Sequence, residues 1–321
     1  RYRTGKPATR NVTIPDWLGQ SLAQENLNSD RTRGFDLTVR HHNHFGDFLY
    51  GITGNMAFSR MMNRYVEHTD YGTQYLNWRN NSTNRYNDIW WGYDYAGQFN
   101  DLYEIWDAPI MDNLGNSQLK PGDYCYEDWN GDGVIDENDL HPIKYGAQTS
   151  PVLYYGLTLD LSWKGIDLTA VFQGGAFNNV KYDWYLSTPF IYDKNGPDFF
   201  FDRWHMEDAS ADPLDPRTKW VRGYLPTTSQ GSNAMSLNTS TSAASLHEAS
   251  YIRLKSLELG YTLPKKWVQK VNASSVRVFT NAYNLLTCTG LKYLDPEHPS
   301  SGYGTTYPLI CTVNFGVNIK F

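Results

Sequence analysis

One short stretch carries the oxygen ligands expected of a calcium-binding loop. Residues 128–139 read DWNGDGVIDEND, with acidic or amide side chains at alternate positions before Gly133. Oxygen ligands at positions one, three and five, followed by a glycine for a sharp turn, are typical of the EF-hand calcium loop. The six expected ligands are Asp128, Asn130, Asp132, the backbone carbonyl of Val134, Asp136 (directly or through water) and Asp139.

The calcium interpretation has one competing alternative. Gly-Asp-Gly forms turns readily, so the stretch could be a solvated acidic turn. We expect structural Ca²⁺ instead, because gathered carboxylates repel one another and a divalent cation reverses that repulsion. The closing residue is Asp139 rather than Glu, which makes binding through both oxygens harder. The flanking sequence does not indicate two helices, so the ion would stiffen a long connection with little core of its own.

Alternation of apolar and polar residues is the dominant pattern of the chain. In 153–163 the odd-numbered residues are Leu, Tyr, Leu, Leu, Leu and Trp, whereas the even-numbered residues are largely polar. This alternation indicates a strand with one apolar face. The Lys164-Gly165 link predicts a hairpin to the next strand. A change of phase between Leu254 and Leu257 predicts a β-bulge. We expect seven strands, at about 33–44, 47–60, 150–163, 166–177, 250–262, 275–288 and 307–321.

The links between these strands alternate strictly between short and long. The short ones lie at about 45–46, 164–165 and 263–274, and the long ones span 61–149, 178–249 and 289–306. Short turns at one end and long loops at the other are typical of outer-membrane barrels. The alternative is a soluble β-sandwich with two insertions. Seven strands cannot close a barrel alone, so we expect an all-β segment of a larger transmembrane antiparallel barrel.

Composition excludes some other classes of protein. The net charge is −6, from 28 Lys and Arg against 34 Asp and Glu, with no basic patch, so no nucleic-acid partner is expected. Mean hydropathy is −0.58, and no apolar run approaches the ~18 residues of a membrane helix. Such a composition is still compatible with a membrane barrel, because lipid-facing and lumen-facing residues alternate.

Several blocks resemble one known family. SYIRLKSLELGYTLPKKW (250–267), VRVFTNAYNLLTCTGLKYLDPE (276–297) and NFGVNIKF (314–321) resemble the C-terminus of SusC/RagA-family TonB-dependent transporters. DWNGDGVIDENDLHPI (128–143), followed by YYGLTLDLSWKGIDLTAVFQG (154–174), is similar to the sequence that precedes the last strands in that family.

The resemblance implies a fold, a location and partners. It implies a 22-stranded barrel in the outer membrane of Gram-negative Bacteroidetes, with an N-terminal plug, a SusD-like surface lipoprotein as lid, and energy from TonB. This chain would supply the last seven or so strands: 1–32 as an outer loop or preceding strand end, and 33–321 as the barrel segment with long extracellular loops. The plug would lie outside this chain, and the rest of the barrel polypeptide and the lipid bilayer would surround it.

The expected function is active import of a nutrient, either a glycan or a peptide. A passive outer-membrane porin and a secreted calcium-dependent carbohydrate-binding β protein remain as alternatives. None of the common catalytic motifs is present, so no enzyme activity is expected. Inward polar side chains expected to line the lumen or to touch the plug are Thr158, Asp160, Asn314 and Asn318.

Two segments of the long loops, 86–106 and 182–204, are dense in aromatic rings. These rings could contact substrate, pack the loops together or contact a lid, since aromatic residues are enriched at interfaces. The expected substrate or lid contacts are Trp90, Trp91, Tyr93, Tyr95, Trp106, Trp184 and Tyr185.

Histidine and cysteine give weaker signals. His41 and His42 would point to opposite faces of a strand, so these and His44 are not expected to bind metal. If residue 276 faces residue 321 in an antiparallel pair, Cys288 and Cys311 come close enough for a cross-strand disulfide. The third cysteine, Cys125, would then be left free.

Overall fold

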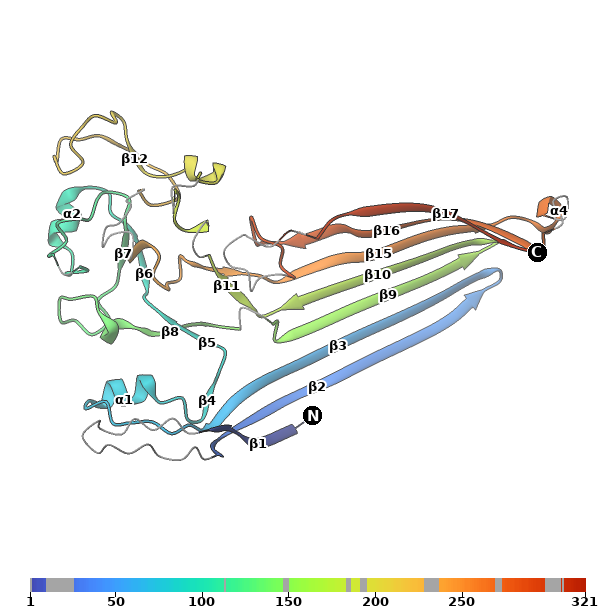
Figure 1. The fold of residues 1–321 in the computed structure, drawn as a ribbon, viewed down its shortest axis with the longest axis horizontal. Helices are drawn as coiled ribbons and strands as arrows, with labels where there is room; N and C mark the ends of the chain where they lie inside the picture. The colour runs from blue at the N-terminus through green and yellow to red at the C-terminus, as the bar shows by residue number, and fades with distance from the viewer. Residues whose placement is uncertain are drawn as a thin grey trace.

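One long antiparallel sheet dominates the protein. The computed structural model describes residues 2–9, 26–112, 114–146, 150–182, 186–190, 195–227, 237–268, 273–297, 307 and 309–321. The strands of the sheet run side by side in the order β1-β2-β3-β9-β10-β15-β16-β17, and β4 pairs with β3 (Figure 1). Their bounds are β1 Tyr2–Thr9, β2 Asn26–Phe45, β3 Phe48–Tyr65, β4 Arg85–Tyr86, β9 Leu153–Trp163, β10 Ile166–Ala176, β15 Tyr251–Thr262, β16 Ser275–Thr289 and β17 Thr312–Lys320.

The seven predicted strands are present, and they pair in the order in which they follow one another in the sequence. Each short link joins neighbours, as at Lys164 and Gly165, whose positive φ values of 47° and 88° fit the twist of a two-residue hairpin. The predicted bulge is also present, because the pairing of β15 shifts between Leu254 and Ser256. Two details differ from the prediction: β2 begins at Asn26 rather than near 33, and β1 precedes it within 1–32, the segment expected to be an outer loop or a preceding strand end.

The two faces of the sheet differ in chemistry, as the alternation predicts. Register places Leu161, Leu168 and Leu259 on one face, and Asp160, Thr169 and Glu258 on the other. The apolar face is solvent-exposed in this chain, with Phe315 84% and Val317 61% exposed. Other exposed residues of this face include Phe35, Leu37, Val39, Ile52, Leu157, Val278, Val313 and Ile319.

The polar face carries an ordered charge network. Arg277 donates to Asp167 (Nε to Oδ1, 3.1 Å) and to Glu258 (2.7 Å) across three strands. Gly260 makes this possible, since a Cβ there would lie 2.3 Å from the Arg277 guanidinium. All four side chains predicted to face inward belong to this face, where Thr169 donates to Asp160 (2.9 Å) and Asn314 donates to Asn281 (3.0 Å).

The long connections gather at one end of the sheet and form what we call the loop layer, the described parts of 66–152, 177–250 and 290–311 (Figure 1). The opposite end holds the short turns, α4 (Lys265–Val268) and the C-terminus. The loop layer contains short elements of its own. Its strands and helices are α1 Gln74–Asn80, β5 Ile89–Gly92, β6 Tyr95–Gln98, α2 Leu102–Asp107, β7 Tyr124–Tyr126, η2 Glu137–Asp139, β8 His141–Tyr145, β11 Asn179–Lys181, η5 Asp198–Phe201, β12 His205–Met206, β13 Trp220–Val221 and β14 Leu246–Glu248.

The first long connection has a core, which corrects the expectation that it would have little. Two short sheets, β5 with β8 and β6 with β7, frame it. Apolar side chains pack between them and α2, whose first turn is capped by Asp101 accepting from the Glu104 N–H (2.9 Å). The buried cluster consists of Phe99, Leu102, Ile105, Met111, Leu119, Tyr124, Tyr126 and Ile135.

The possible Cys288–Cys311 disulfide is not formed. Both cysteines are free and exposed, and Cys125 is free and half-buried. The register of β16 with β17 pairs Val276 with Ile319 rather than with Phe321, and the pairing ends at Tyr283 with Thr312. Extending it by one residue puts Cys311 opposite position 284, four residues or about 13 Å before Cys288. A disulfide needs Cα atoms within about 7 Å.

No helix in the described part of the chain is long and apolar enough to cross a bilayer.

Candidate functional site

A pocket of about 490 Å³ opens in the loop layer where three connections from distant parts of the sequence meet. Tyr124 of β7 comes from the first long connection, Tyr182 and His247 from the second, and Lys292 and Tyr293 from the third. Its described lining is Tyr124, Tyr182, Leu186, Ser187, Phe199, Phe200, Asp202, Tyr224, Leu225, Pro226, Asn238, Thr239, Ala244, Ser245, His247, Gly290, Lys292 and Tyr293. The volume lies within the range of small-molecule sites.

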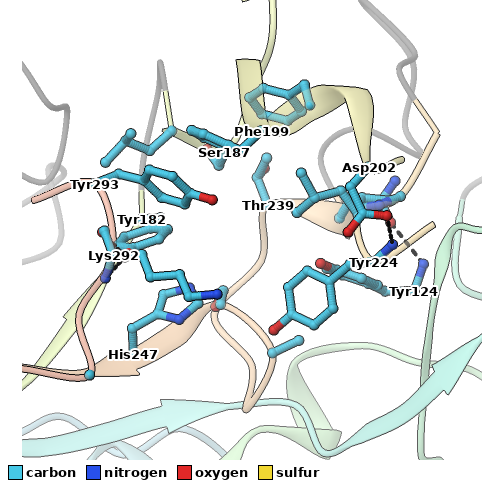
Figure 2. A pocket seen from close by; sticks show the side chains of 18 residues that line it. Tyr124, Tyr182, Ser187, Phe199, Asp202, Tyr224, Thr239, His247, Lys292 and Tyr293 are labelled. Carbon is cyan, nitrogen blue, oxygen red and sulfur yellow. Dashed lines mark hydrogen bonds between the residues drawn. The ribbon is translucent and has the colours of Figure 1, made fainter. Parts of the chain in front are cut away.

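One side of the pocket is a fixed aromatic wall. The rings of Tyr182 and His247 stack with centroids 3.9 Å apart. The Tyr182 hydroxyl donates to the Lys292 carbonyl and accepts from the Lys292 N–H (3.2 Å), so the ring is held at one face by His247 and at its tip by Lys292. Beneath it Val180, Ala249 and Leu291 form a small buried core. Figure 2 shows Tyr182, His247, Lys292 and Tyr293 together on this side.

Two titratable groups of this wall, His247 and Tyr182, are neutral at physiological pH. Burial, with a smaller effect of the nearby Lys144 charge, lowers the pKa of His247 to about 4. Burial also raises the pKa of Tyr182 to about 12. Both shifts follow from the cost of charging a group that has lost its water. The wall therefore presents uncharged rings to the cavity.

The opposite side is held by a buried hydrogen-bond network. The Asn238 amide donates to Asp123 Oδ1 (2.8 Å), and its oxygen accepts from the Tyr124 N–H (2.9 Å). Asp123 also accepts from the Thr227 hydroxyl (2.8 Å) and from the Lys120 N–H (2.8 Å). Burial raises the pKa of Asp123, and these donors oppose that rise. Figure 2 places Tyr124, Tyr224 and Asp202 on this side.

Two charged side chains lie at the exposed part of the lining. Lys292 belongs to the aromatic wall and Asp202 to the opposite side (Figure 2). The backbone N–H of Tyr224 donates to Asp202 Oδ1 (3.2 Å), which orients the carboxylate. Phe199, which also belongs to the lining, stacks on Tyr293 with ring centroids 4.1 Å apart. The pocket thus combines a ring-lined interior with one cationic and one anionic group at its mouth.

Three of the seven aromatic residues expected to contact a substrate or lid pack the loop layer instead. Trp90 donates to the Gly146 carbonyl (2.7 Å), and Trp91 meets Trp78 edge-on at 5.3 Å. The ring of Tyr93 packs against Tyr126 of the core, at 5.2 Å. None of the five described candidates belongs to the described pocket lining.

Two of these five candidates are exposed, and two further candidates cannot be placed. Tyr95 is exposed and meets Tyr124 edge-on at 5.2 Å. Trp106 is 61% exposed on α2 beside Tyr103, so its ring faces outward. Trp184 and Tyr185 lie outside the described residues. Sequence reasoning did point to the segment 182–204, which supplies Tyr182, Phe199 and Phe200 to the pocket.

The acidic loop 128–139 is ordered by hydrogen bonds to its own backbone. Asp128 accepts from the N–H groups of Gly131 (2.7 Å) and Gly133 (2.7 Å). Asp139, 1% exposed, accepts from the N–H groups of Trp129 and Asp136. Gly131 and Gly133 have φ of +75° and +82°, the left-handed conformation that a tight loop requires.

Several features of this loop fit calcium, although one does not. Its candidate ligands are all oxygen atoms, and the bridge of Ile110 to Gly133 and Ile135 does not use the Val134 carbonyl. Within the described ranges, however, no group of three or more His, Cys, Asp or Glu side chains is arranged to hold a metal ion. The loop is anchored to α1 by Tyr75, which donates to the Leu140 carbonyl (2.7 Å), and to the core by Ile135.

Two histidines of the first hairpin, His41 and His42, have local contacts on β3. His41 lies 3.0 Å from the Tyr50 hydroxyl, whereas the ring of His42 lies over Gly51. The two rings are on opposite faces of β2, as predicted.

Comparisons with known proteins point to one family. No protein-family model matches the chain. The TonB-dependent receptor P3 of Formosa agariphila is 23% identical over 332 aligned positions, covering 96% of this chain and 30% of that protein. The TonB-dependent receptor SusC of Bacteroides thetaiotaomicron is 26% identical over 203 positions, covering 63% of this chain and 18% of that protein.

Solved structures agree in fold. The structure of the RagAB peptide transporter matches all of this chain with a TM-score of 0.65 at 21% identity. The RagAB peptide importer in its 'closed-closed' state matches with a TM-score of 0.62 at 20% identity. The resemblance to the SusC/RagA family is confirmed. The chain aligns with between 18% and 33% of the length of these relatives, and its antiparallel sheet has the fold of the corresponding part of the RagAB barrel.

Proposed function

We propose that this chain forms part of the barrel wall and outer loops of a TonB-dependent importer in a Gram-negative outer membrane. The observation that carries the proposal is the pairing of an exposed apolar face with a charged polar face on one sheet whose long connections all leave from one end. The named relatives are receptors and transporters, which supports the expectation that the chain is not an enzyme.

The apolar face supports a membrane location. Soluble monomers rarely expose contiguous apolar patches larger than a few hundred Å². Here exposed Val, Leu, Ile and Phe side chains continue from β2 to β17 along the same face. Contact of these side chains with lipid costs no free energy, whereas their contact with water is unfavourable. Lipid does not tolerate open sheet edges, so β1 and β17 would pair with further barrel strands outside this chain.

The opposite face would meet water or another protein domain inside the barrel. Arg277, Asp167 and Glu258 form ion pairs there, and such charges are unfavourable against lipid. Thr158, Asp160, Asn314 and Asn318 would line the same interior or touch a plug. The loop layer would then lie outside the cell.

The resemblance also supports the expected partners. A SusD-like surface lipoprotein would act as a lid over the loop layer, and TonB would supply energy through a plug outside this chain. Exposed Tyr103 and Trp106 of α2 are suited to a protein contact, because exposed aromatic residues are enriched at interfaces.

We further propose that 128–139 binds Ca²⁺ in a structural role. The oxygen-only ligand set, the two glycines with positive φ and the anchored flanks support it. Binding would fix the position of η2 and β8, the last two elements before β9 in the sequence. The loop already has internal hydrogen bonds, so an ion would add rigidity rather than create the fold.

The import function is tested in cells that carry the full-length gene. We expect deletion to abolish growth on the nutrient and uptake of its labelled form, and TonB depletion to have the same effect. Uptake that persists without TonB would support a passive porin instead. Recovery of the full-length protein in the soluble fraction without detergent would contradict the membrane assignment.

A further inference from the structure

We propose that arginines on the apolar face of β2 and β3, just beyond the end of its apolar row, bind the phosphorylated headgroup of an outer-leaflet lipid. The proposal rests on the membrane location proposed above and goes beyond it by naming the lipid chemistry that the sheet recognises. The arginines at this end of the strand pair are Arg31 and Arg33 of β2, and Arg60 and Arg64 of β3.

Register places three of these arginines on the apolar face of the sheet. The rings of Phe35 and Phe58 stack across the strand pair on this face, with centroids 5.8 Å apart. Arg33 and Arg60, each two residues nearer the loop layer, are also direct cross-strand partners. The pairing is regular on both sides of these residues, so the alternation of faces is preserved. The face therefore changes from apolar to basic within one step, and Arg31 continues the basic part.

The height of this change matches the edge of the hydrocarbon region of a membrane. From Phe48 at the short turn to Phe58, β3 runs for about ten residues, or ~34 Å. At the ~40° tilt typical of membrane barrels this is a height of about 26 Å, close to the ~25 Å of an apolar band. Arg60 would lie about 5 Å higher, at the level of lipid headgroups. The last residue of β3 that pairs with β9 is Phe58, so β2 and β3 continue past their neighbour (Figure 1).

The matching positions of the neighbouring strands are uncharged. On the apolar face near the loop layer, Leu153 of β9 pairs with Ala176 of β10. On the same face Ile252 of β15 pairs with Cys288 of β16. At this end of the described strands, the arginines of the apolar face thus belong to β2 and β3. This indicates one local site on the sheet and not a basic ring around the barrel.

One arginine of the cross-strand pair is held in place by the protein itself. Asp88 accepts from Arg60 with both carboxylate oxygens (Nε to Oδ2, 2.8 Å; Nη2 to Oδ1, 2.9 Å). The rings of Tyr86 and Tyr145 lie 3.8 Å and 4.8 Å from the Arg60 guanidinium carbon. These contacts keep Arg60 beside Arg33, although like charges directly opposite one another are unfavourable. An anion that binds beside the pair would offset this cost.

The arginines present an excess of positive charge to the outside. Arg33 and Arg64 are both exposed. Asp88 and Glu67, which follows β3, do not balance the four guanidinium groups, and Asp30 belongs to the opposite face. The planar guanidinium fork of arginine suits phosphate, which it can bind through two parallel hydrogen bonds. The charge and the residue type therefore favour a phosphate group as the anion.

A lipid with a phosphorylated headgroup matches both parts of this surface. Its acyl chains would cover the apolar row that ends at Phe35 and Phe58, and its phosphate would lie beside Arg33. A free phosphate ion matches the arginines alone, because it has no apolar part to place on that row. Lipid A, a phosphorylated glycolipid of the Gram-negative outer leaflet, has the required chemistry.

The test uses the purified full-length transporter, delipidated in detergent, and a fluorescent lipid A titrated at low salt. The competitors are unlabelled lipid A, its dephosphorylated form and inorganic phosphate. We expect lipid A to compete at least about tenfold better than the dephosphorylated form, and inorganic phosphate not to compete. Arg33→Gln should weaken lipid A binding by about fivefold, and its combination with Arg64→Gln by about twentyfold. Arg33→Lys keeps the charge and should retain most of the affinity.

Arg40→Gln is the matched control for the face of the sheet. Arg40 is an exposed arginine of the same strand, but it pairs with Thr53 and belongs to the polar face. Its substitution should leave lipid A binding unchanged. Equal competition by dephosphorylated lipid A, displacement by inorganic phosphate, or equal weakening by Arg40→Gln would overturn the proposal.

Lipid binding and import can fail separately. TonB-dependent uptake by a protein without phosphate-dependent lipid binding would reject this inference and leave the import function standing. Lipid A binding that depends on Arg33, in a protein whose uptake persists without TonB, would support this inference and contradict the import function.

Discussion

The carboxylate of Asp123 accepts a 2.8 Å hydrogen bond from the amide of Asn238, 115 positions later in the sequence. Asp123 is 0% exposed and Asn238 is also buried. The first residue lies beside β7 in the first long connection, and the second lies in the connection between β10 and β15. This buried pair therefore joins two loops that share no strand of the main sheet, and it fixes one side of the pocket.

Asn238→Ala should loosen that side of the pocket. It removes a donor from buried Asp123 and the acceptor of the Tyr124 N–H, and each unsatisfied buried group costs about 1–3 kcal/mol. Hydrogen exchange of 123–126 should become faster while exchange in β9 and β10 stays unchanged. Asn195→Ala, at an exposed position, serves as the control. Unchanged exchange at 123–126 would show that the pair does not stabilise the loops.

The aromatic wall should weaken in acid. The pKa of His247 is about 4 in the folded protein, below its ordinary value of 6.5, so the unfolded wall binds more protons between these values. The stability contributed by neutral His247 is present above pH 6.5 and is lost as the pH falls toward 4. Hydrogen exchange of β11 and β14 should accelerate over this range. His247→Phe keeps a ring and should remove most of the acceleration, and equal acceleration in both proteins would contradict this assignment.

Arg253 should hold the third connection against the sheet. Its guanidinium is 2% exposed and pairs with Asp295 (2.7 Å) and Glu297 (3.1 Å), just after the pocket residues 292 and 293. Arg253→Ala removes the cation from Asp295, while Glu297 keeps its pair with Lys255 (2.8 Å). Breaking a buried ion pair typically costs about 3–5 kcal/mol. Limited proteolysis should then cleave within 290–297. Arg217→Ala breaks an exposed pair with Asp215 and should not increase cleavage there.

Calcium should stiffen 128–139 if the proposed site exists. After treatment with a chelator, added Ca²⁺ is expected to slow hydrogen exchange in 128–140, with a Kd on the order of 10⁻⁴–10⁻³ M, as in extracellular calcium modules. Asp132→Ala should abolish the effect. Asp212→Ala, in an acidic turn outside the loop, should not. A loop equally protected with chelator and with calcium would reject the site.

A charged substitution on the apolar face of β17 should reduce the amount of folded protein in the membrane. Phe315→Arg places a cation on the face proposed to meet lipid, at a cost of about 2–4 kcal/mol near the bilayer midplane. The amount of folded, heat-modifiable barrel in the outer membrane should fall. Asn314→Arg, one residue earlier on the opposite face, should reduce it much less. Equal loss from both substitutions would argue against a lipid-facing row.

The sheet could be predicted because the alternation of apolar and polar residues within each strand shows which side chains share a face. The alternation in β9 and the Lys164-Gly165 turn depend on neighbouring residues alone. The register of β16 with β17 could not be fixed in this way. A shift of two residues preserves every face, so the pattern did not distinguish the pairing of Val276 with Ile319 from its pairing with Phe321. The wrong disulfide followed from that error.

The pocket was harder to predict because ring density does not reveal which rings are free. Trp90 and Trp91 lie in a segment dense in aromatic residues, yet their side chains pack against other residues of the loop layer. Tyr224 and Tyr293 stand apart from both dense segments and still reach the pocket. Their position depends on contacts between connections more than a hundred residues apart, such as Tyr182 with Lys292, and no local pattern encodes these.

The separation of two-residue turns from long connections has a consequence for how such proteins diverge. Inserting or deleting residues between β10 and β15 leaves the pairing of both strands intact, whereas one extra residue at Lys164-Gly165 would disturb the hairpin. Natural variation in length among relatives should therefore accumulate at the loop-layer end and be nearly absent at the other. The strands of the barrel would then stay almost unchanged among relatives, while the loop layer changes as the imported nutrient changes.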